Sequence, residues 1–237
     1  MDARSSIAQA RTAGRSSLDE LTGKRLLAEF GVSVPASVMV QAGEALAPKL
    51  ANLKPPFVLK VMSPEILHKS DVGGVRIRLH SAAEIEAAMQ AMLANPEIGA
   101  KRLDGFLIEE MAPAGQELVV GGLRDPQFGP LVMVGLGGIF VEVLKDVAFR
   151  ICPIERIDAE QMLEELKGKA LLDGARGQAA VSKGAIIDVL LKVGGHDGLL
   201  MTLAADIAEA DINPIIVSAA GAVAVDARFI LTPRAHL

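Results

Sequence analysis

The 237-residue sequence contains no tryptophan, no tyrosine, seven phenylalanines and a single cysteine, Cys152. One thiol excludes an intrachain disulfide and any cysteine-clustered zinc or iron–sulfur site, and it suits a reducing cytoplasm. The scarcity of aromatic rings argues against a stacking platform for single-stranded nucleic acid. No apolar run reaches the roughly 18–20 residues that span a bilayer. We therefore expect a cytoplasmic protein with no nucleic-acid and no membrane partner.

The composition that remains is that of a folded protein. Hydrophobic residues make up 51% of the chain and charged residues 22%, which excludes disorder as the main state. The net charge of −5 argues against general binding to nucleic acids or anionic membranes. The length allows one large domain or two smaller lobes.

The first 17 residues carry Arg4, Arg11 and Arg15 among alanines and serines. They lack the apolar stretch of a secretory signal. They also lack a strong apolar period, so we expect residues 1–17 to form a flexible N-terminal arm.

Two capping-box spacings predict helix starts. Ser17 and Glu20 precede an apolar period, so residues 18–35 are expected to supply a lead-in helix. Ser81 and Glu84 repeat the spacing before a second amphipathic helix.

Strand patterns alternate with these helices in an α+β layout that has more hairpins than crossovers. Residues 74–79 alternate cleanly, which predicts Val75, Ile77 and Leu79 on one face of a strand. Further strands are expected at 37–40, 57–62, 105–111, 117–122, 130–134, 147–151, 212–217 and 222–226, and helices near 159–167, 178–192 and 196–209. The GLGG run at 135–138 lies between strand patterns, whereas a Rossmann fold needs a strand–GxGxxG–helix unit.

Lys60 lies inside the apolar strand FVLKVM at 57–62. A lysine in such a strand is costly unless it is paired. Two readings remain open: a lysine that reaches solvent from an edge strand, or a cation that contacts phosphate.

The loop SPEILHKSDVGG, residues 63–74, is far longer than a tight hairpin turn. Gly73 and Gly74 would let backbone amides approach an anion, and Lys69 would add a positive charge. An ordinary solvated loop is the alternative. His68 could act as a general base, a ligand or a covalent phosphate acceptor.

Acidic residues follow in two further places. Glu109 and Glu110 fall on opposite faces of their strand by alternation, and Glu117 lies beyond the next turn. One of them could bind an amine or a ribose hydroxyl, and solvated edge-strand acids are the alternative.

Asp211, Asn213 and Asp226 lie on the C-terminal hairpin. The first two are two residues apart and so face the same side of a strand, and Asp226 ends the strand paired with it. Three oxygen ligands suit a Mg²⁺ ion that keeps several waters, whereas turn-capping acids are the alternative reading.

The sequence resembles the ATP-grasp β subunit or β-type domain of the NDP-forming acyl-CoA synthetases, of the ADP-forming acetate–CoA ligase type within the succinyl-CoA synthetase superfamily. The matching stretches are spread over residues 18–230. They are FVLKVMSPEILHKSDVGGVRIRL, GFLIEEMAPAGQELVVGGLRDPQFGPLVMVGLGGIFVEVLKDVAFRICPI, LLDGARG and DINPIIVSAAGAVAVDARF. One departure is Ala175, where the family often has an aromatic residue.

The resemblance implies an ATP-grasp fold with the nucleotide between two lobes, a smaller one at 36–111 and a larger one at 112–237 that holds a Mg-binding hairpin. It implies a ligase that uses ATP and Mg²⁺: acid, CoA and ATP give acyl-CoA, ADP and phosphate through acyl phosphate and phosphohistidine.

The resemblance also implies a role for each candidate residue. Lys60 would contact ATP phosphates, and the covering loop would be formed by Lys69, Gly73 and Gly74. His68 would relay phosphate.

The remaining roles concern the nucleoside and the metal. Glu109, with the backbone of Glu110 and Met111, would face adenine, and Glu117 would face the ribose. Asn213 and Asp226 would hold Mg²⁺, with Asp211 near them.

The family further needs a CoA-binding domain and a ligase domain, for which this chain has no room. A CoA-binding α subunit is therefore the implied partner, in a hetero-oligomer. The start at Met1 and the expected arm favour a separate subunit over a fragment of a fused enzyme. The alternative functions are a nucleotide-binding regulatory module and an ATP-grasp carboxylate–amine ligase.

Overall fold

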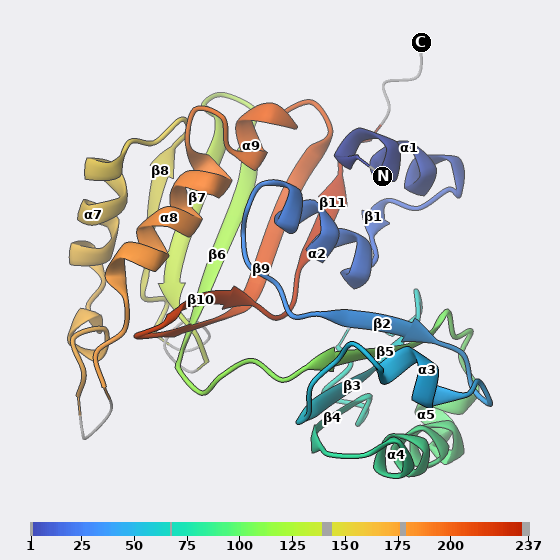
Figure 1. Cartoon of the computed structure of the whole chain (residues 1–237). Helices are drawn as coiled ribbons and strands as arrows, with labels where there is room; N and C mark the ends of the chain where they lie inside the picture. The colour runs from blue at the N-terminus through green and yellow to red at the C-terminus, as the bar shows by residue number, and fades with distance from the viewer. Residues whose placement is uncertain (1, 67, 139–143, 176–178, 234–237) are drawn as a thin grey trace. The chain divides into compact units, whose positions relative to one another are not determined.

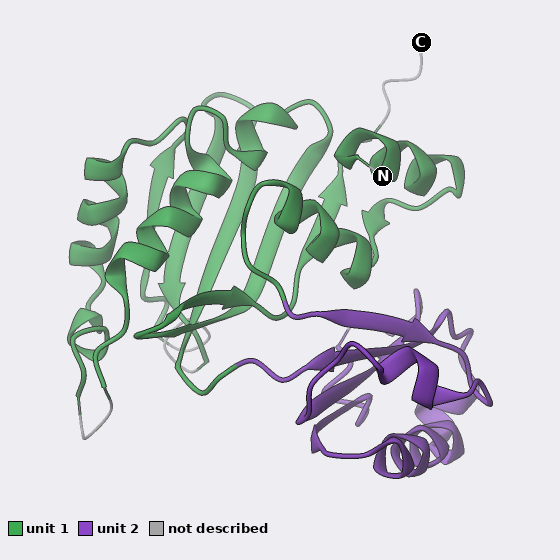
Figure 2. Ribbon diagram, in the orientation of Figure 1, with its two compact units in different colours: residues 1–34, 113–237 green, residues 35–112 purple. Residues whose placement is uncertain are grey.

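The computed structural model describes residues 2–66, 68–138, 144–175 and 179–233. The chain divides into two compact units, coloured separately in Figure 2. Unit 1 contains Met1–Val34 and Pro113–Leu237, and unit 2 contains Pro35–Ala112. The mixture of helices and strands confirms the α+β class. The first 34 residues belong to the larger unit, whereas the sequence suggested that they stand apart from both lobes.

Unit 1 is built on a seven-stranded antiparallel sheet in the order β1-β11-β9-β6-β7-β8, with β10 paired to β9 (Figure 1). The strands are β1 Ser17–Leu18, β6 Gln116–Asp125, β7 Gly129–Leu136, β8 Val147–Ile151, β9 Ile207–Ser218, β10 Gly221–Ala224 and β11 Arg228–Leu231. The C-terminal hairpin expected around 219–221 is confirmed, because β9 and β10 pair there.

Helices pack on one face of this sheet, as Figure 1 shows for α8 and α9 in front of β6 and β7. The helical elements of unit 1 are α1 Ala3–Thr12, α2 Glu20–Glu29, α7 Arg156–Glu165, the 3₁₀ turn Lys169–Leu171, α8 Lys183–Gly194 and α9 Leu199–Thr202. Alternate residues of β7 face this layer: Val132, Val134 and Leu136 are each 0% exposed. The core of unit 1 lies between the sheet and these helices.

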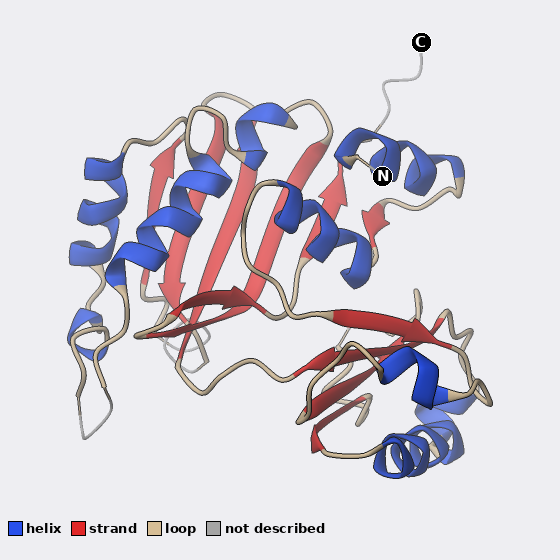
Figure 3. Ribbon diagram, in the orientation of Figure 1, coloured by secondary structure: helices blue, strands red, loops and turns tan. Residues whose placement is uncertain are grey.

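Unit 2 has a four-stranded antiparallel sheet in the order β2-β5-β3-β4. Its elements are β2 Ser37–Val40, α3 Leu46–Leu50, β3 Phe57–Met62, β4 Val75–Leu79, α4 Ala82–Ala94, α5 Pro96–Gly99 and β5 Gly105–Glu110 (Figure 3). Phe57, Leu59 and Val61 alternate toward a core that they share with α4. The cap of α4 is as expected, since Ser81 Oγ accepts from the Glu84 amide at 3.2 Å.

The prediction of a flexible arm at residues 1–17 is wrong. Residues 3–12 form helix α1, and Ile7 is 2% exposed within the core of unit 1. Arg11 Nη1 lies 2.8 Å from Asp206 Oδ1, and Arg11 Nη2 donates to Thr232 Oγ1 at 3.0 Å. The sequence signal is weak because only a narrow apolar stripe of this short helix is buried.

The lead-in helix expected within 18–35 exists as α2, but its cap is not Ser17. Asp19 is the N-cap residue and accepts from the Thr22 amide at 2.9 Å, while Ser17 lies in β1 opposite Ile230. Both Ser17 and Asp19 are good caps. Strand pairing decides between them.

The alternation expected for residues 74–79 breaks inside β4. Pairing with β3 shifts register between Phe57 and Leu59, and Arg78 has a φ of 60°. Val75 lies opposite Lys60 and Leu79 opposite Phe57, so the two fall on different faces of the sheet, and Ile77 is 52% exposed.

The helix expected over 196–209 is also wrong beyond its first turn. Helix α9 ends at Thr202, and β9 begins at Ile207. Pairing of β9 with both β6 and β11 outweighs the helical spacing of the leucines. Among the described residues, no helix is long and apolar enough to cross a membrane.

Candidate functional site

Lys60 is a buried cation in the centre of the unit 2 sheet. It lies on β3, between β5 and β4, and is 7% exposed, so the edge-strand reading is wrong. Its Nζ lies 3.0 Å from Glu109 Oε2 on β5. The two side chains reach diagonally across neighbouring strands, since Val58 is the register partner of Glu109. The carboxylate of Glu109 stabilises the buried ammonium group of Lys60, because a lysine buried without a partner would be costly.

This pairing changes the role expected for Glu109. Its side chain is 2% exposed and is committed to Lys60, so a direct contact with adenine does not fit its position. The sequence placed both residues on apolar strands but gave no register between those strands. The ion pair of Lys60 and Glu109 therefore could be found only from the pairing of β3 with β5.

The backbone that follows Glu109 is held within unit 2. The Glu110 amide donates to Ala36 O at 3.0 Å, and the Met111 amide donates to Pro56 O at 2.8 Å. The Glu110 carboxylate accepts from the Lys54 amide at 2.9 Å, on the opposite side of the strand from Glu109. Both amides at the expected adenine contact are thus already hydrogen-bonded.

His68 lies exposed in a loop that is anchored on both sides. Before it, Ile66 is 7% exposed in the core of unit 2, and Ser63 Oγ donates to Arg102 O at 2.7 Å. After it, Val72 O accepts from Asn95 Nδ2 at 2.9 Å. The fold therefore offers an imidazole to solvent from a segment whose ends are fixed.

The glycine pair shapes this loop and does not present its amides. Gly73 has a φ of +71°, and its amide donates to Ser70 O at 3.1 Å. The Gly74 amide donates to Lys69 O at 2.7 Å, and a Cβ on Gly74 would lie 2.5 Å from Val61 Cγ1. Both amides satisfy turns of the loop itself, so the expected anion cradle is not formed by them in this structure. Lys69 is half-buried in the same turn.

Asp211 of the C-terminal hairpin lies on the face of the unit 1 sheet opposite the helices. Asp211 on β9 pairs with Gly121, which pairs with Met133, which pairs with Phe149. Phe149 is 51% exposed, which marks this face as open.

Asn213 shares the open face with Asp211. Ile212, between them, is 0% exposed, so the alternation expected from their spacing holds there. The sheet register shifts just beyond, where Val120 pairs with Ile212 but Leu118 pairs with Ile215.

Asp226 lies close to Asp211 and affects its charge. Burial, followed by the negative charges of Asp226 and Glu209, raises the pKa of Asp211, and Arg228 opposes this shift. Arg228 is the register partner of Asp211, a neighbour that sequence reasoning missed.

Two carboxylates that repel each other, with an amide nearby, fit a divalent cation that would relieve the repulsion. Within the described residues, no group of three or more His, Cys, Asp or Glu side chains converges. The donor set of Asp211, Asp226 and Asn213 is therefore one that would leave several positions of Mg²⁺ to water and phosphate oxygens.

Glu117 lies on β6 and is exposed, as a ribose contact requires. Its backbone carbonyl accepts from the Gly137 amide at 2.8 Å, and a Cβ on Gly137 would lie 2.9 Å from Glu117 Cβ. The glycine of the GLGG run thus packs against Glu117. Arg176 and Gly177, which end the LLDGARG motif, lie outside the described residues.

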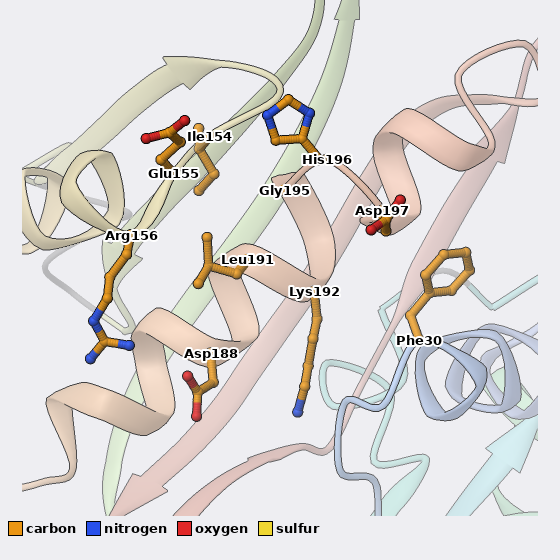
Figure 4. Close-up of a pocket in the computed structure, with 10 residues that line it drawn as sticks. All are labelled: Phe30, Ile154, Glu155, Arg156, Asp188, Leu191, Lys192, Gly195, His196 and Asp197. Atoms are coloured by element: carbon orange, nitrogen blue, oxygen red, sulfur yellow. The ribbon is translucent and has the colours of Figure 1, made fainter.

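A separate groove of about 540 Å³ lies in unit 1, between the end of α8 and the start of α7. Figure 4 shows its ten lining residues, among them His196, Asp197 and Lys192. Lys192 Nζ donates to Gly31 O at 2.7 Å. None of the predicted site residues lines this groove.

Comparisons with known proteins identify the family of this chain. The ATP-grasp domain model matches residues 9–231. The β subunit of ADP-forming acetate–CoA ligase I from Pyrococcus furiosus is 42% identical over 231 residues, which cover 97% of both chains. This chain belongs to the ATP-grasp family, among the β subunits of ADP-forming acetate–CoA ligases.

The solved structures place this ATP-grasp chain in the same group. It superposes with a TM-score of 0.91 and 39% identity on the dinucleotide-forming acetyl-CoA synthetase 1 of Ca. Korarchaeum cryptofilum, covering 98% of this chain and 100% of that one. A second structure of that enzyme, 40% identical with a TM-score of 0.84 over 98% and 100% of the chains, holds Mg-AMPPCP, and its phosphohistidine segment points towards the nucleotide binding site.

The ATP-grasp chain also matches part of a longer relative. The ADP-forming acetate–CoA ligase I of Archaeoglobus fulgidus is 39% identical over 211 residues, which cover 88% of this chain but 30% of that protein.

Proposed function

We propose that this chain is the ATP-binding β subunit of an ADP-forming acyl-CoA synthetase, which relays phosphate through His68. The observation that carries the proposal is the exposed imidazole on an anchored loop, in a chain 42% identical to an acetate–CoA ligase β subunit. The related Korarchaeum structures with a phosphohistidine segment support the same role.

The proposed step is phosphoryl transfer between ATP and one imidazole nitrogen of His68. A nitrogen–phosphorus bond forms, the bond from the γ-phosphorus to the bridging oxygen breaks, and ADP leaves with that oxygen. Such transfer depends on positioning and on neutralising charge more than on acid–base chemistry. The flanking anchors at Ile66 and Val72 would limit the path of His68.

Lys60 supplies the fixed positive charge in this scheme, and Glu109 keeps it in place. The exposed Glu117 carboxylate would bind ribose hydroxyls. Asn213, Asp226 and Asp211 would hold Mg²⁺, which neutralises phosphate charge when bound. Lys69, next to His68, would meet phosphate as a point charge.

The partner in the proposal is a CoA-binding α subunit. The longer Archaeoglobus relative supports this, because the chain matches only 30% of it and the remainder must carry its other functions. We also propose a cytoplasmic location, in which the single thiol of Cys152 stays reduced.

The test is a mass measurement on the whole chain after incubation with Mg-ATP, once nucleotide binding has been measured. We expect acid-labile phosphate on His68, absent in His68→Ala and present in His80→Ala. His80 is the matched control, since it is an exposed histidine at the other end of β4.

The other outcomes separate the competing functions. Nucleotide binding without phosphate on His68, even with an α subunit added, would indicate a regulatory module. Transfer of phosphate to a carboxylic acid by His68→Ala would indicate a carboxylate–amine ligase. No nucleotide binding would refute the proposed function.

A further inference from the structure

Helix α2 contains a buried ion pair that none of the roles above uses. Lys24 Nζ lies 2.8 Å from Glu20 Oε1, one helical turn away, and each side chain is 2% exposed. Removing two charges from water is costly, and apolar side chains of similar size often stabilise such a site equally well. Helix stability alone therefore does not explain the pair.

Lys24 also reaches outside its own helix. Its Nζ donates to the carbonyl oxygen of Val225 at 3.5 Å. Val225 begins the link 225–227, which joins β10 to β11 and has Asp226 at its centre. The ammonium group thus contacts the peptide unit that leads directly into Asp226.

The helix lies against this link along one face. A Cβ on Gly23 would lie 3.0 Å from Ala227 O and 3.1 Å from the Phe229 ring. Glu20, Gly23 and Lys24 are spaced three and four residues apart, so they occupy the same side of α2.

Two backbone hydrogen bonds hold the start of the link. The Ala224 amide donates to Ser33 O at 2.9 Å, just after α2, and the Val225 amide donates to Pro214 O at 3.0 Å, next to Asn213. The residues before Asp226 are therefore tied both to the α2 region and to β9.

We infer that the Glu20–Lys24 pair positions Asp226 for metal binding, by anchoring the backbone that carries it. Lys24 supplies the contact to Val225. Glu20 neutralises Lys24, so that the anchor adds no net positive charge near carboxylates that must bind a cation. Both are positioning residues, and the inference rests on the proposed function of Asp226 as a metal ligand.

The first test measures amide hydrogen exchange in the whole chain without nucleotide. In Glu20→Gln/Lys24→Met, we expect the amides of 224–227 to exchange about tenfold faster than in the unmodified chain. Leu27→Ala is the control for general weakening of α2, because Leu27 is fully buried on the same helix. Arg156→Met/Glu160→Gln removes an exposed pair of the same spacing. Exchange that is unchanged, or equally fast in Leu27→Ala, would overturn the inference.

A second variant guards against misfolding of the double substitution. Gly23→Ala retains the ion pair but places a Cβ against Ala227 O. It should also speed exchange at 224–227, since the link must shift.

The second test measures AMPPCP binding by calorimetry with and without Mg²⁺. We expect Mg²⁺-dependent binding to weaken about tenfold in Glu20→Gln/Lys24→Met, as for other residues that orient metal ligands. Binding without Mg²⁺ should be unchanged. Faster exchange with unchanged Mg²⁺ dependence would overturn the link to metal binding. Failure of the unmodified chain to bind Mg-AMPPCP would instead refute the proposed function, and the exchange result would still decide whether the pair anchors the link.

Discussion

The ammonium group of Lys60 lies beside the carboxylate of Glu109 inside the unit 2 sheet. Nζ and Glu109 Oε2 are 3.0 Å apart, and the two side chains are 9% and 2% exposed. A pair buried to this degree depends on both partners, because either charge alone would remain desolvated.

We expect Glu109→Gln to lower the free energy of unfolding by about 3–5 kcal/mol, since Lys60 would lose its counter-charge. Urea unfolding followed by circular dichroism measures this. Glu109→Leu/Lys60→Met should recover most of the loss yet bind ATP weakly, because the phosphate contact would be gone. Equal destabilisation in the single and double variants would contradict this account.

Cys152 is a second buried residue whose chemistry follows from its surroundings. Burial raises the pKa of the thiol to about 11. The proton is held more tightly in the folded state, so the stability that it contributes is present below the unfolded pKa. That stability is lost as the pH rises towards about 11.

We expect the folded protein to resist alkylation by iodoacetamide near pH 8, where the thiolate fraction is on the order of one in a thousand. Denaturant should restore the rate of an ordinary thiol. Cys152 is the only cysteine, so the measured rate belongs to it alone. Rapid alkylation of the folded chain would show that burial does not protect the group.

At the scale of elements, α1 is part of the core of unit 1. Ile7 is 2% exposed, and the Ala3 amide donates to Glu29 Oε2 at 2.7 Å. Arg11 forms an ion pair with Asp206, a residue near the other end of the sequence.

Ile7→Ala should therefore destabilise the protein by about 2–5 kcal/mol, the usual range for a buried isoleucine. Thermal or urea unfolding measures the change. Gln9→Ala is the control on the same helix, because Gln9 is exposed, and should change stability by less than about 0.5 kcal/mol. Similar values for the two variants would support the flexible arm after all.

The elements also show where local patterns fail. In β4, an irregularity near Arg78 exposes Ile77, although the residues alternate well in the sequence. After α9, strand pairing takes over at Ile207 although the apolar spacing still suits a helix. Both outcomes depend on pairing with other strands, which the periodicity of the segment itself does not specify.

At the scale of the molecule, each unit has its own hydrophobic core. The core of unit 2 is formed from residues of one continuous segment, 35–112, whereas unit 1 combines both ends of the chain. A continuous segment with its own core can in principle fold alone.

We expect residues 35–112, expressed alone, to unfold cooperatively in urea. Its stability should be small, because a domain of this size buries a modest apolar area. Lys60→Met/Glu109→Leu in this segment tests whether the pair stabilises it without unit 1. A segment without a cooperative transition would show that unit 2 depends on the rest of the chain.

The sequence by itself determined the family, the α+β class and most strands, because these follow from local periodicity and from long motifs around Lys60, His68 and Asn213. It also placed Glu109 and Glu110 on opposite sides of one strand. Such features depend on residues close together in the chain.

Only the tertiary structure decided which groups meet. The pairing of Lys60 with Glu109, the approach of Arg228 to Asp211, and the contact of Lys24 with Val225 each join elements that are separated in sequence. The sequence pattern likewise did not predict that α1 packs in the core of unit 1. Register and packing are properties of whole sheets and cores, so the sequence window around any one residue does not contain them.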